Sequence, residues 1–144
     1  MIAVDTNILV YAHRAEAPFH HASLECLSGL VASGRRWAIP WPCVHEFLSV
    51  VTRSLMIPPT PMPIAFDAVQ AWLATGSVDL IGEAENHLDT LRELAVGGKI
   101  AGPAIHDARI AAICLAHGVR ELWSADRDFS RFLNLTVVNP LLNS

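Results

Sequence analysis

The sequence predicts an α/β protein with three layers, α/β/α, built around a central, mostly parallel sheet of five strands. Short strand-like runs alternate with longer helical stretches along the chain, and this alternation is typical of parallel sheets covered by helices. The 144 residues are enough for one ordinary hydrophobic core. The proline-rich segment 57–63 is too short to link two domains, so we expect residues 1–144 to form a single domain.

Five short, mainly apolar runs predict the strands. They cover residues 2–5, 37–40, 77–81, 120–124 and 136–138. All but the last two runs are separated by stretches long enough for helices, which favours parallel pairing.

Proline positions and apolar spacing predict the helices. Pro42 begins one of them, and its apolar residues recur at steps of three and four. These residues are Val44, Phe47, Leu48, Val51 and Leu55. Pro103 begins another helix and Gly118 ends it. The remaining helical stretches are 21–33, 64–75 and 84–96. Because 64–75 is apolar on nearly every side, we expect part of it to face a protein partner.

Composition excludes several classes of protein. The chain is 52% hydrophobic with a mean hydropathy of +0.36, yet no run approaches the ~18 apolar residues of a membrane span. The N-terminus lacks the basic start and apolar core of a signal peptide, so we expect a cytoplasmic protein without membrane association. The three cysteines form no CxxC pair and are expected to be reduced core residues. A net charge of −4 argues against binding nucleic acid by charge alone.

Asp5 interrupts an apolar N-terminal stretch, MIAVDTNILVYA. Residues 2–4 and 8–11 are apolar, so the carboxylate lies between two runs that should be buried. A buried charge is costly unless it is paired, hydrogen-bonded or bound to a metal. Asp5 also ends the first predicted strand, at the edge where open parallel sheets bind their ligands. A functional role therefore explains this residue better than a structural one.

Three further acids are expected near Asp5. Asp126 follows the fourth strand, and it reaches the same crevice if the first and fourth strands are neighbours. Glu46 and Asp107 lie in early turns of two helices that begin above that edge. Each acid has an ordinary alternative: Asp126 can cap the short helix that follows it, Asp107 can favour a helix N-terminus, and Glu46 can be a solvated helical residue.

Four carboxylates in one crevice would repel one another and would need a cation. Two unit charges about 4 Å apart cost about 4 kcal/mol at an effective dielectric near 20. Oxygen ligands favour Mg²⁺ or Mn²⁺, and the sequence has neither an HExxH motif nor a Cys/His set for zinc. We therefore expect Mg²⁺ (or Mn²⁺) at this site.

Four segments, taken in order, resemble the PIN-domain ribonucleases. They are VDTNILVYA, HEFLSV, HDARIAAICLAHGV and WSADRDF. The likeness is greatest to the compact VapC-type toxins of toxin–antitoxin pairs, and it extends from residue 2 to about residue 132. It implies a PIN-like fold and a Mg²⁺-dependent endoribonuclease that leaves a 5′-phosphate and a 3′-hydroxyl. It also implies a homodimer that is inhibited by a cognate antitoxin protein.

The resemblance assigns roles to the acids. Asp5, Glu46, Asp107 and Asp126 match the catalytic quartet that holds the metal. Asp128 matches an additional acid that binds a second ion or a metal-bound water.

Three polar residues match positions that support the acids. These are Thr6, Asn7 and Ser124, for which local hydrogen bonding is the alternative. Ser124 stands where the family often has Thr, which keeps the hydroxyl group.

Four arginines are candidates for contacts with RNA phosphates because they lie near these acids in the sequence. They are Arg14, Arg109, Arg127 and Arg131. Ordinary surface ion pairs are the alternative for each of them.

Other functions have less support. A phosphotransferase of the haloacid dehalogenase type would need an acid at position 7, where the chain has Asn7. A flap-type DNA nuclease normally has more acids and more helices than this short chain provides. A PIN-like module that binds RNA or protein without cutting would be marked by loss of acids, and all four are present.

Overall fold

The computed structural model describes residues 1–142, and its central sheet has five strands. They are β1 (Ile2–Val4), β2 (Trp37–Pro40), β3 (Val78–Ile81), β4 (Glu121–Trp123) and β5 (Thr136–Val138). Their order across the sheet is β3-β2-β1-β4-β5, and every neighbouring pair is parallel. The five-stranded sheet is confirmed, and it is parallel throughout.

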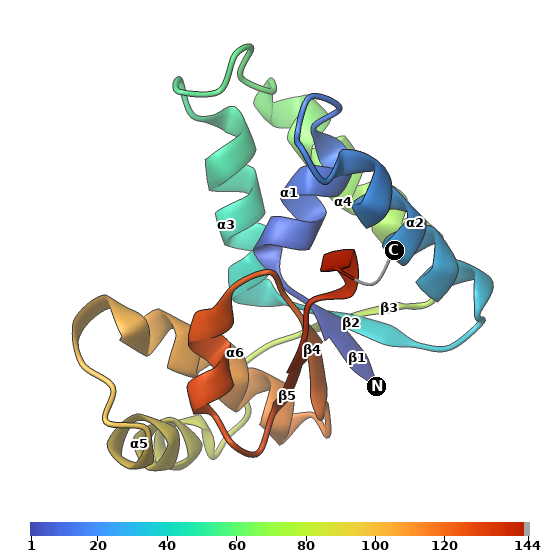
Figure 1. Ribbon diagram of the computed structural model, residues 1–144. Helices are drawn as coiled ribbons and strands as arrows, with labels where there is room; N and C mark the ends of the chain where they lie inside the picture. The colour runs from blue at the N-terminus through green and yellow to red at the C-terminus, as the bar shows by residue number, and fades with distance from the viewer. Residues whose placement is uncertain (143–144) are drawn as a thin grey trace.

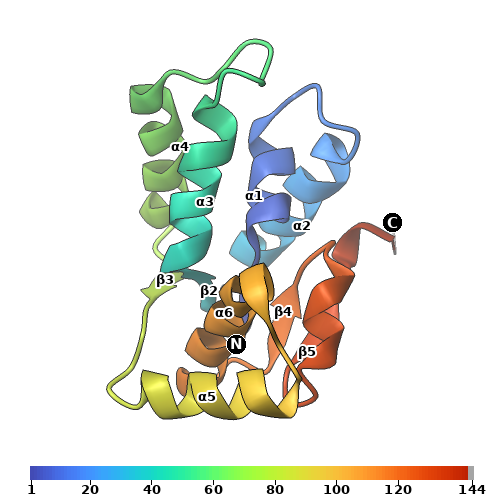
Figure 2. The same ribbon diagram turned by 90° about the vertical axis from the view of Figure 1, so that its left-hand side faces the viewer.

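Helices cover both faces of the sheet (Figure 1). The α-helices are α1 (Thr6–His13), α2 (His20–Ala32), α3 (Trp41–Thr52), α4 (Met62–Ala74), α5 (His87–Gly97) and α6 (Ile105–Ala116). Three short 3₁₀ helices are η1 (Gly102–Ala104), η2 (Arg127–Arg131) and η3 (Pro140–Leu142). Figure 2 shows α1 to α4 on one side of the sheet and α5 and α6 on the other. The predicted three-layer α/β/α arrangement is therefore confirmed.

The chain reverses its direction across the sheet at β1. It passes from β1 to β2 and β3 through α1–α4, and it then crosses through α5 and α6 to β4 and β5 on the other side of β1. Because crossovers between parallel strands are right-handed, the two sets of helices lie on opposite faces. Such a switch point leaves a crevice at the carboxyl ends of the two adjacent strands, here β1 and β4.

Hydrogen bonds hold β1 and β4 in register up to that crevice. Val4 lies opposite Trp123, and the Asp5 N–H donates to the Trp123 carbonyl at 3.0 Å. The core on both faces of the sheet contains large side chains with less than 2% exposure. Among them are Ile8, Leu9, Trp37, Ile39, Phe47, Ile113, Leu122, Phe129 and Phe132. Cys43 and Cys114 are buried and unpaired, as expected, and Cys26 is half-buried.

Two segments differ from the sequence-based expectation. The apolar run 8–11, to which no element was assigned, belongs to helix α1, because Asp5 caps that helix instead of extending the strand. Helix α3 ends at Thr52, where the backbone of Arg53 becomes extended. Leu55, predicted to continue the apolar stripe, therefore lies in a loop and is 82% exposed.

The loop 53–61 between α3 and α4 is fastened to the end of α1 by Arg14. The guanidinium group is buried, and its Nη1 donates to the Pro58 carbonyl at 2.7 Å and to Thr60 Oγ1 at 3.1 Å. Its Nε donates to Glu16 Oε1 at 2.5 Å. Because these bonds use a charged donor, they are stronger than neutral ones. Arg14 thus fixes the path of the loop.

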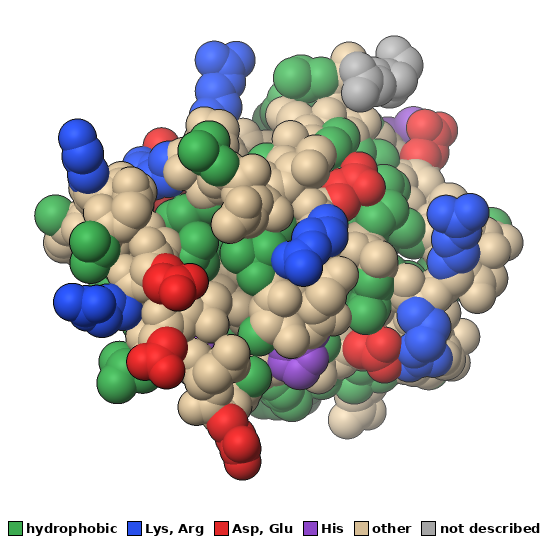
Figure 3. All heavy atoms as spheres, turned by 90° about the horizontal axis from the view of Figure 1, so that it is seen from below, with side chains coloured by type: hydrophobic (Ala, Val, Ile, Leu, Met, Phe, Trp, Pro, Cys, Tyr) green, Lys and Arg blue, Asp and Glu red, His purple; other side chains and the backbone are tan. Residues whose placement is uncertain are grey.

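Apolar side chains remain exposed along α4, as its all-round apolar sequence predicted. Met62, Ile64 and Phe66 are each about half exposed. On the face in Figure 3, by contrast, basic, acidic and apolar side chains are interspersed. A partner at α4 stays a prediction. None of the helices in residues 1–142 has the length and apolarity needed to cross a membrane.

We predict that Arg14→Ala lowers the free energy of unfolding by about 2 kcal/mol, because buried groups lose hydrogen bonds to a charged donor. Urea unfolding followed by circular dichroism measures this change. Arg35→Ala is the matched control: Arg35 is exposed, and its substitution should change stability by less than about 0.5 kcal/mol. Equal stability of the two variants would show that the Arg14 contacts do not hold the loop.

Candidate functional site

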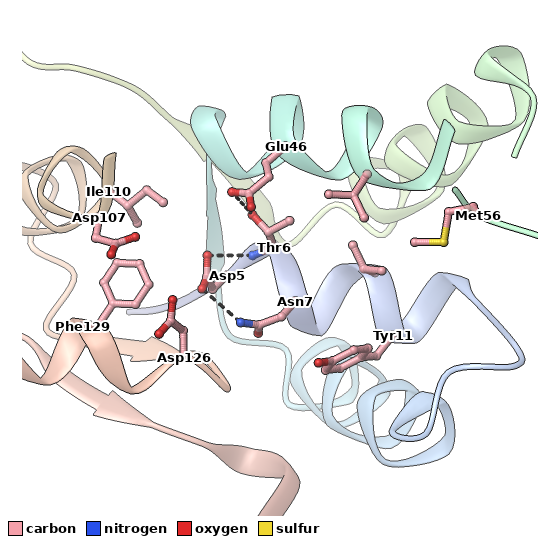
Figure 4. A pocket seen from close by; sticks show the side chains of 12 residues that line it. Asp5, Thr6, Asn7, Tyr11, Glu46, Met56, Asp107, Ile110, Asp126 and Phe129 are labelled. Carbon is pink, nitrogen blue, oxygen red and sulfur yellow. Dashed lines mark hydrogen bonds between the residues drawn. The ribbon is translucent and has the colours of Figure 1, made fainter. Parts of the chain in front are cut away.

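A pocket of about 330 Å³ opens at the carboxyl ends of β1 and β4, where the topology predicts a crevice. Its lining comes from α1, α3, α6, η2 and the loop that follows α3. The lining residues are Asp5, Thr6, Asn7, Val10, Tyr11, Glu46, Val50, Met56, Asp107, Ile110, Asp126 and Phe129. The structure thus brings all four predicted acids to one pocket (Figure 4).

Asp5 lies at the base of this pocket and is only 4% exposed. Its Oδ1 accepts hydrogen bonds from the Thr6 N–H at 2.8 Å and from the Cys43 thiol at 3.4 Å. Its Oδ2 accepts a 2.7 Å bond from the Ser124 hydroxyl. Burial raises the pKa of the Asp5 carboxyl above its ordinary value, and the nearby Glu46 charge raises it further, while these hydrogen bonds act in the opposite direction.

Ser124 and Asn7 tie β4 to α1 around Asp5. The Asn7 amide donates to Ser124 Oγ at 3.3 Å and to Asp5 Oδ2 at 3.4 Å. Asn7 Oδ1 in turn accepts from the Ala125 N–H at 3.2 Å. The backbone N–H of Asp126 donates to Ser124 Oγ at 3.0 Å. The two segments are therefore fixed to each other through polar contacts that the isolated elements cannot make.

Asp126 begins η2 and caps it, because its Oδ1 accepts from the Asp128 N–H at 2.9 Å. The capping alternative is thus correct, and it coexists with a place in the pocket. Asp107 lies in the first turn of α6. One carboxylate oxygen from each of Asp107, Asp126 and Asp128 lies within 4.8 Å of the others.

Burial and three neighbouring carboxylates raise the pKa of Asp107 to about 6. The neighbours are Asp126, Asp128 and Asp5, in order of decreasing effect. Arg131 acts in the opposite direction, and its Nη2 lies 3.7 Å from Asp128 Oδ1. The single positive charge of Arg131 does not neutralise the neighbouring carboxylates, so the site keeps an excess of negative charge.

Glu46 faces the acids from α3, across the pocket. Its Oε2 accepts a 3.2 Å hydrogen bond from the Thr6 hydroxyl, and the residue is otherwise exposed. It lies outside the tight group formed by Asp107, Asp126 and Asp128. Thr6 therefore connects the capped end of α1 to the acid on α3.

The residues of the pocket fit a hard divalent cation. Every acidic donor is a carboxylate oxygen, which suits Mg²⁺, Mn²⁺ or Ca²⁺ better than zinc. The upward shift of the Asp107 pKa reflects burial first and then the charges of the neighbouring carboxylates. A bound cation would offset the repulsion among these charges.

The four arginines expected to contact RNA lie in different surroundings. Arg14 is not at the acidic end of the pocket and is engaged by the loop 53–61. Arg109 donates to Glu83 at 2.5 Å, and Arg131 donates to the Asp128 carbonyl at 2.9 Å. Arg127 is exposed and makes no side-chain hydrogen bond or ion pair within residues 1–142.

Sequence reasoning missed two features of the site. Cys43, assigned to the core, donates its thiol proton toward Asp5, and burial keeps its pKa well above the ordinary value. The only sequence signal was its place three residues before Glu46, on one face of the helix. The second feature is an apolar end of the pocket, which includes Tyr11 and Met56.

Comparisons with known proteins agree with this architecture. The model of the PIN domain family matches residues 2–133. Ribonuclease VapC43 of Mycobacterium tuberculosis is 36% identical over 142 residues, which cover 98% of this chain and 96% of the relative. Ribonuclease VapC48 of the same species is 28% identical over 137 residues, 94% of each chain.

Solved structures share the fold at lower identity. The crystal structure of FitAcB from Neisseria gonorrhoeae aligns with a TM-score of 0.73 at 20% identity, covering 97% of this chain and 98% of the other. The structure of Mycobacterium tuberculosis VapC20, described as a toxin that cleaves the sarcin–ricin loop, aligns with a TM-score of 0.67 at 16% identity, covering 94% and 98%. The chain belongs to the PIN-domain family and, within it, to the VapC ribonucleases.

Proposed function

We propose that this chain is a Mg²⁺-dependent endoribonuclease that hydrolyses RNA phosphodiester bonds and acts in the cytoplasm as the toxin of a toxin–antitoxin pair. The observation that carries this proposal is the convergence of Asp107, Asp126 and Asp128 beside the buried Asp5 at the switch point of the sheet. The curated relatives named ribonucleases support the choice of RNA as substrate. The complete set of acids favours a cutting enzyme over a module that only binds.

Asp107, Asp126 and Asp128 would hold the cation, with Asp5 and Glu46 completing the catalytic set from the other side of the pocket. When bound, Mg²⁺ (or Mn²⁺) supplies Lewis-acid chemistry: it makes water more acidic and offsets charge on the phosphodiester.

The side chains around the acids orient them. Thr6, Cys43 and Ser124 hold the Asp5 carboxylate in one position through hydrogen bonds to both oxygens. Such preorganisation keeps the charge of the site aimed at the reacting phosphate. One pocket carboxylate accepts the proton of the attacking water, and the products carry a 5′-phosphate and a 3′-hydroxyl.

A cognate antitoxin and a second copy of the chain are proposed as protein partners. The exposed apolar residues of α4 are suited to such contacts. Solved neighbours include VapBC2 from Rickettsia felis bound to a promoter DNA fragment and a toxin–antitoxin complex from Klebsiella pneumoniae. We propose that residues 1–144 work as one domain in these assemblies.

Cleavage of total RNA by purified, antitoxin-free protein tests the proposed activity. We expect discrete cuts with Mg²⁺, none with EDTA, and a loss of more than about 100-fold for Asp5→Asn, above the range typical of residues that only support metal ligands. Sequencing of the cut ends identifies the target and the end chemistry. Cuts that persist in EDTA, or that leave a 2′,3′-cyclic phosphate, would contradict the proposal.

Removal of the Asp107 charge should stabilise the metal-free protein at neutral pH. Because the folded pKa of about 6 exceeds the ordinary 3.8, deprotonation between about pH 4 and pH 6 favours the unfolded chain. In EDTA, Asp107→Asn should therefore melt at a higher temperature than wild type at pH 7.5 and at nearly the same temperature at pH 4.

With saturating Mg²⁺ at pH 7.5, wild type is expected to melt at a higher temperature than Asp107→Asn, since the cation stabilises the folded state that binds it. Thermal scans of both proteins in EDTA and in Mg²⁺ measure the four melting temperatures. If Asp107→Asn gains as much from Mg²⁺ as wild type does, Asp107 is not a ligand.

Arg127 is the arginine that we propose to contact an RNA phosphate, because it is exposed and directly follows Asp126 in the sequence. In an Asp5→Asn background, which we expect to bind RNA without cutting it, Arg127→Ala should weaken binding to all sequences similarly. The slope of log affinity against log salt should fall by about 0.7, the value for one phosphate on a single strand. Filter binding over a salt series measures both, with Arg35→Ala as the control. An unchanged slope would exclude this contact.

A further inference from the structure

The pocket that contains the acids continues into an apolar end that metal binding does not require. Val10 and Tyr11 of α1, Val50 of α3 and Met56 of the following loop line this end. In Figure 4, Tyr11 and Met56 lie beyond Asn7 and Thr6, on the side of the pocket away from Asp107 and Asp126. The cavity therefore has its acids at one end, beside Ile110 and Phe129, and no acid at the other end (Figure 4).

The helical repeat produces this division. On α1, Thr6 and Asn7 face the acids, and Val10 and Tyr11 follow four residues later on the same face of the helix. On α3, Glu46 faces the acids and Val50 follows four residues later. Both helices thus present a polar turn and then an apolar turn to one continuous groove.

The walls of the apolar end are held in place. The loop that contains Met56 is fastened by the buried Arg14 through Pro58 and Thr60. The Tyr11 ring packs at a tilt against Phe19, with centroids 5.5 Å apart. Tyr11 itself is half-buried, so one part of its ring contacts the protein and another part faces the pocket. The apolar end is therefore a formed feature of the fold.

We infer that this apolar end binds one unstacked nucleobase of the RNA, the base of a nucleotide next to the scissile phosphate, with the Tyr11 ring as its stacking surface. The inference rests on the proposed ribonuclease function, because it takes the phosphate to lie at the acidic end of the same groove. Aromatic side chains are the usual platforms for bases that are splayed out of single-stranded RNA. A nucleotide has the matching polarity, with a charged phosphate and a flat apolar base.

The size of the pocket restricts what it accepts. A volume of about 330 Å³ is near the lower limit for a small-molecule site, so it holds part of one strand and excludes a duplex. Tyr11 and Met56 would then select single-stranded or looped RNA and set a preference for the base that occupies the apolar end. A nucleotide fits both ends of the groove when a cation at the acids holds its phosphate, whereas an apolar side chain fits only the apolar end.

The test begins with a pool of short, randomised single-stranded RNA and wild-type protein in Mg²⁺. The cut ends, or those from total RNA if the pool is not cut, define a preferred site, and absence of cutting in both would overturn the ribonuclease function itself. Once a site is known, single-turnover cleavage is measured on that RNA and on two analogues. Each analogue carries an abasic ribose on one side of the scissile phosphate.

We expect Tyr11→Ala to lower the cleavage rate at subsaturating enzyme by roughly 10- to 100-fold, the range that stacking of one base supplies. Tyr11→Phe keeps the ring and should retain most of the rate, and Met56→Ala should change the base preference at the same position. Leu88→Ala is the control: Leu88 is 76% exposed on α5, outside this pocket, and its variant should cut as wild type does. Thermal melting shows whether each variant is folded.

Measuring Tyr11→Ala on the abasic RNA analogues tests the inference even if this variant is less stable than wild type. Wild type should lose roughly 10- to 100-fold on one abasic analogue, while Tyr11→Ala should lose almost nothing further on it, because the two changes remove the same contact. If wild type cuts both analogues as well as the intact RNA, no base is bound there. The base subsite is also excluded if the losses in rate from Tyr11→Ala and from the abasic analogue multiply. It is excluded as well if Tyr11→Ala weakens antitoxin binding but leaves RNA cleavage unchanged.

Discussion

The parallel pairing of β1 with β4 is the constraint on which the site depends. It places the carboxyl end of the first strand beside a segment almost 120 residues later in the chain, so that the Ser124 hydroxyl reaches Asp5 Oδ2 at 2.7 Å. The same pairing is the switch point of the sheet, from which crossovers leave toward opposite faces. Helices α1 and α3 therefore approach the crevice from one face, and α6 approaches it from the other. The acids converge because each of them lies near the start of a helix that this topology brings to the crevice.

Burying and gathering these carboxylates destabilises the folded state, and the structure shows which contacts offset this effect. Burial of Asp5 is offset by hydrogen bonds to both carboxylate oxygens, from a backbone N–H, a hydroxyl and a thiol. Around Asp107 no comparable set of donors exists within residues 1–142, and its pKa rises to about 6. The first acid is thus held by the protein, whereas the acids of α6 and η2 are arranged for a ligand of opposite charge. Concentrated strain of this kind is typical of functional sites.

Helices α1 and α3 line the groove beside the acids, and they join the proposed reaction site to the proposed base-binding site. A polar turn followed by an apolar turn on α1, repeated on α3, makes one cavity that suits both a phosphate and a base. The buried Arg14 belongs to the same arrangement, although it does not face the acids, because it fixes the loop that carries Met56. A residue expected to contact RNA directly therefore shapes the pocket from behind.

The sequence alone determined the fold class and the places of the five strands, and it predicted that four acids meet at one edge of the sheet. Period-two and period-3.6 patterns are local, and an acid between apolar runs is conspicuous without any structure. Helix α1 was missed because a capping Asp directly after a strand resembles an interruption of that strand. The end of α3 was misplaced, since the apolar spacing through Leu55 is compatible with a longer helix. Only the tertiary structure decided that Cys43 contacts Asp5, that Arg14 is buried and that Tyr11 and Met56 extend the pocket. These facts depend on contacts between segments 30 or more residues apart, or on the path of a loop, and neither is encoded in local periodicity.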